Sequence, residues 1–258
     1  MAASTWDPTQ YNRFAAERSA PFWDLAGLLH TVDGPTLVDM GCGDGALTAA
    51  LHERLGASRT LGIDSSPAML AETKAVATAS CTFAEGDIAN GPPGTFDVVL
   101  SNAALHWVPD HAVVLRRWVD ALTPGGQLAV QVPANWDHPS HVVSRELGAE
   151  LLGPDAPPDP VAEHVLAPER YAELLHELGL VEQHVRLQVY GHLLPSPAEV
   201  VEWVKGTSLT RFKSVLSAED FDGFVEEYRR RLLAVLGAPE PFFYPFKRIL
   251  FWGRLAAG

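Results

Sequence analysis

Val38-Asp39-Met40-Gly41-Cys42-Gly43-Asp44-Gly45 joins the end of an apolar run to three closely spaced glycines. The run before the glycines has the composition of a buried β-strand, and the residues after them have the pattern of a helix. Glycines at such a junction let the backbone turn sharply and approach a ligand without a Cβ atom in the way. This stretch therefore predicts an α/β fold with a ligand-binding loop after its first strand.

Outward from this loop, residues 35–133 alternate short β-rich runs with helical segments, as in a parallel sheet with crossover helices. The predicted strands are 36–40, 59–63, 81–85, 96–101 and 126–132. The predicted helices between them are 46–55, 67–78 and 111–122. We expect this region to be a Rossmann-like cofactor-binding core with helices on both faces of a mostly parallel sheet.

The flanking regions are expected to add mostly helices to the same domain, which spans residues 1–258. Residues 8–30 are predicted to be helical and divided by Pro21, within a lid of residues 1–31. A helical substrate-capping lobe is predicted over 134–240, with one strand at 185–193. Its helices are expected at 142–152, 168–178, 197–204 and 218–236, with a proline-rich loop at 153–160 between the first two. A last strand at 245–255 lies within the C-terminal segment 241–258.

Composition limits the classes of function that fit this chain of 258 residues. Apolar residues make up 47% and charged residues 20%, as in a folded globular protein, and the net charge is −13. That charge argues against nucleic acid as a partner, because phosphates need a basic surface. No apolar run is long enough for a membrane span, and residues 1–14 lack the pattern expected of a secretory signal. With only Cys42 and Cys81 and no disulfide framework, we expect a cytoplasmic protein.

The glycine loop favours one kind of ligand. Its spacing is shorter than the dinucleotide fingerprint, and Asp44 would repel a pyrophosphate at the start of the helix. A ligand carrying an ammonium and a sulfonium fits better, since Asp39 can accept a hydrogen bond from a cation. Taken alone, the loop is also compatible with a purely structural tight turn.

Acidic and polar residues after the following strands strengthen the ligand prediction. Asp64 lies about 20 residues beyond the loop, where a carboxylate can accept both ribose hydroxyls, although it could also cap the next helix. Asp87 can bind the adenine amine while Ile88 covers the ring. Together these features predict an S-adenosylmethionine site. Its expected residues are Asp39, Gly41, Cys42, Gly43, Asp64, Ser65, Met69, Asp87, Ile88 and Asn102.

Several motifs are more specific than the glycine loop. They are Phe14-Ala15-Ala16-Glu17-Arg18-Ser19, Asn102-Ala103-Ala104-Leu105-His106-Trp107-Val108-Pro109-Asp110-His111 and Pro245-Phe246-Lys247-Arg248, with further matches at 6–8, 11, 64–70 and 129–136. Through these motifs the chain resembles class I methyltransferases, and most closely the trans-aconitate 2-methyltransferases, over nearly its whole length. The resemblance implies methylation of one carboxylate of trans-aconitate to give a monomethyl ester and S-adenosylhomocysteine.

The resemblance also suggests a substrate pocket for a small anionic carboxylate. A carboxylate nucleophile is already ionised at neutral pH, so no catalytic base is required, and Arg18, His106 and Trp107 would orient the substrate. Two positions depart from the family pattern: Ala20 and Lys247 stand where relatives carry arginine, whose guanidinium binds carboxylates by two parallel bonds. The expected substrate residues are Tyr11, Arg18, His106, Trp107, Trp136, Lys247 and Arg248.

Other functions remain open at this stage. A phenolic or carbon acceptor would call for a base, for which His106 is the candidate. A non-catalytic S-adenosylmethionine-binding protein is a second alternative, whereas Asp44 argues against a nicotinamide dehydrogenase. The ten histidines show no metal-ligand spacing, so no metal is expected, and no G-x-S-x-G elbow supports a serine hydrolase. A monomer or weak homodimer is expected.

Overall fold

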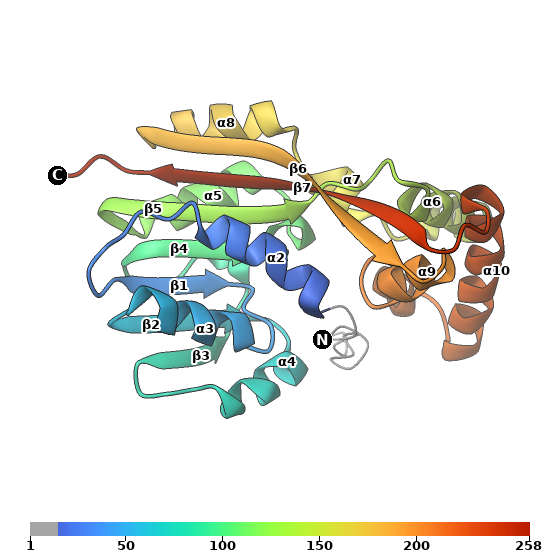
Figure 1. Cartoon of the computed structure of the whole chain (residues 1–258), viewed down its shortest axis with the longest axis horizontal. Helices are drawn as coiled ribbons and strands as arrows, with labels where there is room; N and C mark the ends of the chain where they lie inside the picture. Colours follow the sequence, from blue (N-terminus) through green and yellow to red (C-terminus); the bar gives the residue numbers. More distant parts are fainter. Residues whose placement is uncertain (1–14) are drawn as a thin grey trace.

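A seven-stranded sheet in the order β3-β2-β1-β4-β5-β7-β6 forms the centre of the computed structural model, which describes the chain from residue 15 to residue 258 and its side chains from residue 19 (Figure 1). The first five strands are mutually parallel, and β7 runs antiparallel to both β5 and β6. The strands are β1 (Thr36–Met40), β2 (Arg59–Asp64), β3 (Cys81–Glu85), β4 (Phe96–Asn102), β5 (Leu122–Pro133), β6 (Glu182–Leu194) and β7 (Phe242–Arg254).

Helices cover both faces of this sheet and extend beyond it. The α-helices are α2 (Ala15–Ala26), α3 (Ala46–Leu55), α4 (Pro67–Glu72), α5 (His111–Asp120), α6 (Pro139–Leu152), α7 (Pro160–His164), α8 (Pro168–Glu177), α9 (Ala198–Lys205) and α10 (Ala218–Leu236). Single turns of 3-10 helix are η1 (Thr73–Ala75), η2 (Ile88–Asn90), η3 (Leu105–Trp107), η4 (Gly153–Asp155) and the longer η5 (Ser208–Ser214). Within the described residues no helix is both long enough and apolar enough to cross a membrane.

The two faces of the sheet carry separate apolar cores. On one face, α2 and α3 contribute Phe22, Leu25 and Leu51 to a cluster with the sheet. On the other face, α5 and α8 contribute Trp118 and Tyr171 to the largest cluster. This two-sided burial explains why β1 and β4 are buried along most of their length rather than at alternate residues.

A second lobe stands beside the sheet, on the side toward which the parallel strands point (Figure 1). Helices α6, α9 and α10 share an apolar core there with the free ends of β6 and β7, which continue past β5 as a two-stranded ribbon. Leu147, Trp203, Tyr228 and Tyr244 are buried in this core. Helix α8, which also lies between residues 134 and 240, packs on the sheet instead.

Two sequence expectations about the helices were wrong. Pro21 does not divide the N-terminal segment, since α2 runs from Ala15 to Ala26 with Pro21 inside it. A single missing N–H costs one hydrogen bond, and burial of the apolar side of α2 on the sheet offsets that loss. The predicted loop of residues 153–160 also contains η4 and leads directly into α7. Residues 8–14 of the expected helix lie outside the described part.

His111 joins three elements around β4. It begins α5, its Nδ1 lies 2.7 Å from the Tyr171 hydroxyl of α8, and its Nε2 lies 3.0 Å from the Leu105 carbonyl oxygen of η3. Burial lowers the pKa of His111 from 6.5 to about 4 despite these hydrogen bonds. The neutral ring therefore holds the turn after β4 against the helical layer.

This lowered pKa predicts how stability depends on pH. The folded protein binds the His111 proton less tightly than the unfolded chain, so its contribution is complete above pH 6.5 and lost as pH falls toward about 4. Urea unfolding across this range should show a shallower decline for His111→Gln, by up to about 1.4 kcal/mol per pH unit. The exposed His176→Gln should follow the wild-type curve. Parallel curves for wild type and His111→Gln would contradict the prediction.

Candidate active site

The glycine loop after β1 is shaped by its contact with the turn after β4. Gly41 has φ 91°, and a Cβ atom there would lie 2.1 Å from the Cβ of Ala104. The amide nitrogens of Gly41 and Cys42 donate to the Ile63 carbonyl oxygen at 2.7 and 3.0 Å. Glycine is therefore required at position 41 both by its φ and by the close approach. The loop is bound to β2 and lies directly beside the end of β4.

Asp64, at the end of β2, holds this loop from the other side. Its Oδ2 accepts from the Gly43 amide at 2.9 Å, and its Oδ1 accepts from the Ser66 amide at 2.8 Å. Burial raises the pKa of Asp64 against the opposing effect of these amides. The cap of α4 itself is Ser66, whose side chain accepts from Met69. Each carboxylate oxygen of Asp64 retains a lone pair for a ligand hydroxyl.

Asp87 and Ile88 follow β3 and form the far end of the same cleft. The Asp87 carboxylate accepts from the Ala89 amide at 2.9 Å, which leaves its other oxygen open. Ile88 is buried, and its carbonyl oxygen accepts from the indole nitrogen of Trp118 at 2.9 Å. Helix α5 therefore fixes the position of the apolar side chain beside the acid.

These residues enclose a cleft of about 390 Å³ at the carboxyl ends of β1, β2, β3 and β4. Eight of the ten predicted cofactor residues line it: Gly41, Gly43, Asp64, Ser65, Met69, Asp87, Ile88 and Asn102. Ser66, Ala103, Ala104, Trp107 and Val108 complete the lining. The buried Oδ1 of Asn102 has no hydrogen-bond partner among the described residues. With lone pairs also available at Asp64 and Asp87, the donor-rich, cationic S-adenosylmethionine fits this lining.

Asp39 and Cys42 lie outside this lining. Asp39 is buried, and its Oδ2 accepts from the Thr48 hydroxyl of α3 at 2.6 Å. Burial raises the pKa of Asp39 to about 7. The buried Cys42 sulfur lies under the loop beside Gly62. Neither side chain lines the cleft; Thr48 ties one oxygen of Asp39 to α3, and the buried Oδ1 of Asp39 has no hydrogen-bond partner among the described residues.

A second, smaller cavity of about 70 Å³ adjoins the cleft. Asn102, Ala103 and Trp107 line both spaces, so the cavity opens beside the cleft at the end of β4. The remaining wall combines residues of the sheet with residues of the second lobe. Its lining also includes His106, Pro133, His141, Asp159, Pro160, Val161, Trp203, Val204, Thr207, Ser208, Phe246 and Arg248.

His106 is present in this cavity, but as a neutral ring. It is buried, its Nδ1 has no hydrogen-bond partner among the described residues, and its ring centroid lies 4.8 Å from that of Trp107. Burial is the largest of the effects that lower the pKa of His106 to about 3. At neutral pH its ring can donate one hydrogen bond to a ligand or accept one, but its low pKa makes it a weak base. This environment argues against the catalytic base that a phenolic acceptor would need.

The other predicted substrate residues divide into two groups. Arg248 is buried in the cavity wall, donates to Gln131 Oε1 at 3.2 Å and lies 4.6 Å from the Phe246 ring centre. Lys247 points elsewhere: its Nζ lies 2.5 Å from an oxygen of the exposed Asp137 and 5.7 Å from the Trp136 ring centre. Neither Lys247 nor Trp136 lines either space. Alternation along β7 explains the split, since neighbouring residues face opposite sides.

Two predicted residues cannot be placed, and two unpredicted ones were found. Tyr11 and the side chain of Arg18 lie outside the described residues. His141 and Asp159, by contrast, line the cavity and are hydrogen-bonded to each other, yet nothing in the sequence marked them. No group of three or more His, Cys, Asp or Glu side chains in the described part is placed to hold a metal ion.

Known proteins resemble this chain closely. A family model described as "Methyltransferase domain" matches residues 38–130. A trans-aconitate 2-methyltransferase of Deinococcus radiodurans is 42% identical over 252 residues, covering 96% of this chain and 97% of the relative. The enzyme of the same name from Streptomyces avermitilis is 39% identical, with 96% of each chain covered. One from Escherichia coli is 38% identical, with 89% of each covered.

Solved structures agree on the fold. A phosphoethanolamine N-methyltransferase of Haemonchus contortus, solved with S-adenosyl-L-methionine, matches with a TM-score of 0.60 at 18% identity, covering 96% of this chain and 56% of that one. The YcgJ protein of Bacillus subtilis matches with a TM-score of 0.61 at 14% identity, covering 93% and 100%. With the curated relatives matched over nearly their whole length, this chain belongs to the trans-aconitate 2-methyltransferase family of S-adenosylmethionine-dependent methyltransferases.

Proposed function

We propose that this enzyme methylates one carboxylate of trans-aconitate, giving a monomethyl ester and S-adenosylhomocysteine. The observation that carries the proposal is the junction of two spaces, a cofactor cleft and a polar cavity, at Asn102, Ala103 and Trp107. A methyl group presented from the cleft at this junction would meet an acceptor held in the cavity. The names of the curated relatives supply the acceptor.

In the cofactor half, the cleft residues bind and orient the donor. Asp64 accepts from the ribose hydroxyls through its remaining lone pairs, and Asp87 accepts from the adenine amine beside Ile88. Asn102 Oδ1 is available for the amino-acid end of the ligand. When bound, S-adenosylmethionine supplies an electrophilic methyl group for in-line displacement.

In the acceptor half, the enzyme needs position and charge rather than a base. A carboxylate is ionised at neutral pH, so the protein must hold one oxygen about 3 Å from the methyl carbon and exclude water. Arg248 provides a buried guanidinium for a substrate carboxylate. A guanidinium can donate two parallel hydrogen bonds to a carboxylate, which an ammonium cannot. His106 and Trp107 orient the acceptor from η3. A cytoplasmic location and a monomer or weak homodimer remain predictions from the sequence.

The direct test of this function is an assay with methyl-labelled S-adenosylmethionine and trans-aconitate. We expect the label to enter a monomethyl ester that base hydrolyses back to the acid. A panel of other small acids serves as the comparison. Transfer to other acids but never to trans-aconitate would contradict the substrate assignment and leave the methyltransferase class intact.

The role of Asp64 predicts a loss of cofactor affinity on substitution. Asp64→Ala removes the ribose acceptor and leaves the Gly43 and Ser66 amides without their partner. Calorimetry with S-adenosylhomocysteine should show affinity reduced about tenfold to hundredfold, because hydrogen bonds to charged groups are involved. Asp120→Ala, an exposed acid at the end of α5, should bind like wild type. If Asp64→Ala binds S-adenosylhomocysteine as tightly as wild type does, the assignment of this cleft as the cofactor site is wrong.

The contrast between Arg248 and Lys247 predicts opposite outcomes at neighbouring positions. Arg248→Lys keeps the positive charge but removes the planar guanidinium and its paired hydrogen bonds, so KM for trans-aconitate should rise about tenfold. Lys247→Gln breaks the contacts with Asp137 and the Trp136 ring, both outside the cavity, so KM should stay within about twofold. Steady-state kinetics at saturating cofactor measures both. A larger effect at Lys247 than at Arg248 would contradict this placement.

A further inference from the structure

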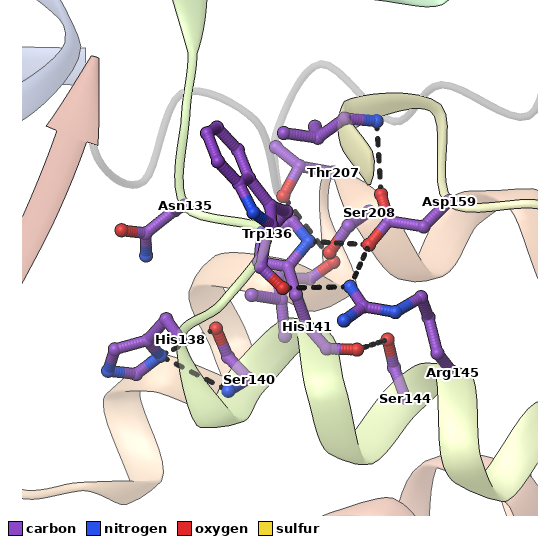
Figure 2. A network of polar contacts seen from close by, with 12 residues as sticks. Asn135, Trp136, His138, Ser140, His141, Ser144, Arg145, Asp159, Thr207 and Ser208 are labelled. Carbon is purple, nitrogen blue, oxygen red and sulfur yellow. Dashed lines mark hydrogen bonds and ion pairs between the residues drawn. The ribbon is translucent and has the colours of Figure 1, made fainter. Parts of the chain in front are cut away.

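A buried histidine–carboxylate pair lies in the lobe wall of the substrate cavity. His141 of α6 and Asp159, the residue before α7, are 3% and 1% exposed, and both line the cavity. The Nδ1 of His141 lies 2.8 Å from Oδ2 of Asp159. Figure 2 shows this carboxylate between the His141 ring and the guanidinium of Arg145. Neither His141 nor Asp159 lines the cofactor cleft.

The pair is held by several independent contacts. Arg145 lies one helical turn after His141 and therefore on the same face of α6. Its Nη1 donates to Asp159 Oδ2 at 3.2 Å. The other oxygen of Asp159 accepts from the Val161 amide at 3.1 Å and caps α7. Burial opposes ionisation of Asp159, but His141 and Arg211 hold its pKa below the usual range. Asp159 is therefore a fixed anion that orients the ring.

This arrangement leaves one ring nitrogen for a ligand. Nδ1 of His141 is engaged with Asp159, and Nε2 has no hydrogen-bond partner within the part of the chain that the structure describes. The hydroxyl of Ser208, in the same wall, is also buried without a partner there. Polar groups in a buried wall are normally satisfied, so the unpaired Ser208 hydroxyl points to a polar ligand in the cavity that His141 also lines.

We propose that His141 binds a substrate carboxylate other than the methyl acceptor, with Nε2 donating the hydrogen bond and Asp159 positioning the ring. This inference rests on the proposed function. The acceptor oxygen must reach the junction lined by Asn102, Ala103 and Trp107, whereas His141 lines only the cavity. The carboxylate it binds is therefore remote from the methyl group. His141 would then donate from Nδ1 to Asp159 and from Nε2 to the substrate carboxylate.

Two substitutions at position 141 separate ligand binding from structural support. His141→Asn places an amide near the Nδ1 position and can keep the bond to Asp159, but it removes the Nε2 donor. His141→Gln reaches the Nε2 position with an amide and gives up the bond to Asp159. If His141 binds the substrate, Asn is the more harmful change for affinity. If it only supports the fold, Gln is the more harmful one.

The measurement is calorimetric titration of trans-aconitate into enzyme saturated with S-adenosylhomocysteine. We expect His141→Asn to weaken binding about tenfold to hundredfold, the range for a hydrogen bond to a charged group, and His141→Gln to weaken it less. His138→Asn is the matched control: it changes a half-buried histidine at the cap of the same helix, outside the cavity, to a favourable capping residue. It should bind like wild type.

Three dicarboxylates identify which substrate group His141 contacts. Itaconate, glutaconate and mesaconate each lack a different one of the three carboxylates of trans-aconitate. His141→Asn should weaken two of them and leave the third, which lacks the contacted group, unchanged relative to wild type. If the Asn variant does not fold, the same series with His141→Gln provides the test.

The outcomes separate the two proposals. If wild type methylates trans-aconitate but His141→Asn binds it as wild type does, or better than His141→Gln, the role of His141 is wrong and the proposed function stands. Equal weakening of all three dicarboxylates also overturns this role. If wild type neither binds nor methylates trans-aconitate, the proposed function is wrong and this inference with it.

Discussion

The close approach of Gly41 to Ala104 is the contact on which the site depends. It brings the loop after β1 against the turn after β4, at the place where the strand order of the sheet changes direction. In open α/β sheets this is where ligands bind, because connections leave β1 and β4 toward opposite sides. A side chain at position 41 would push the two turns apart. The cleft and the cavity would then lose the junction that makes methyl transfer between them possible.

The parts of the structure that the sequence predicted are those with local causes. Strands β1 and β3 and helices α3 and α10 begin and end where the pattern placed them. Most of the predicted cofactor residues line one cleft because they lie at or just beyond strand ends, and parallel strands bring their carboxyl ends to one edge. Asp39 shows the limit of this reasoning. The loop motif marks this position, but the sequence could not show that the side chain turns inward to Thr48.

The substrate cavity was less predictable because its wall is assembled from distant segments. His141 and Asp159 come from a helix and a proline-rich loop whose pairing depends on how α6 and α7 pack, and neither carries a recognisable motif. Lys247 and Arg248 illustrate the same point within two residues. A sequence match names both, while the alternation of β7 turns only Arg248 into the cavity. Side chains alternate between the two faces of a strand, so the sequence alone indicates that Lys247 and Arg248 face opposite sides. It does not show which of the two sides faces the cavity.

The charges of the cavity account for an anionic ligand in a protein of net charge −13. Its buried anion, Asp159, is offset by the guanidinium of Arg145, and Arg248 lines the same space. A local excess of cationic groups reverses the field inside a pocket whatever the overall charge. The neutral His106 fits this division, since a base is unnecessary for a nucleophile that is already ionised. Under the proposed function, the charges in this wall hold carboxylates, and the geometry at the junction brings one of them to the methyl group.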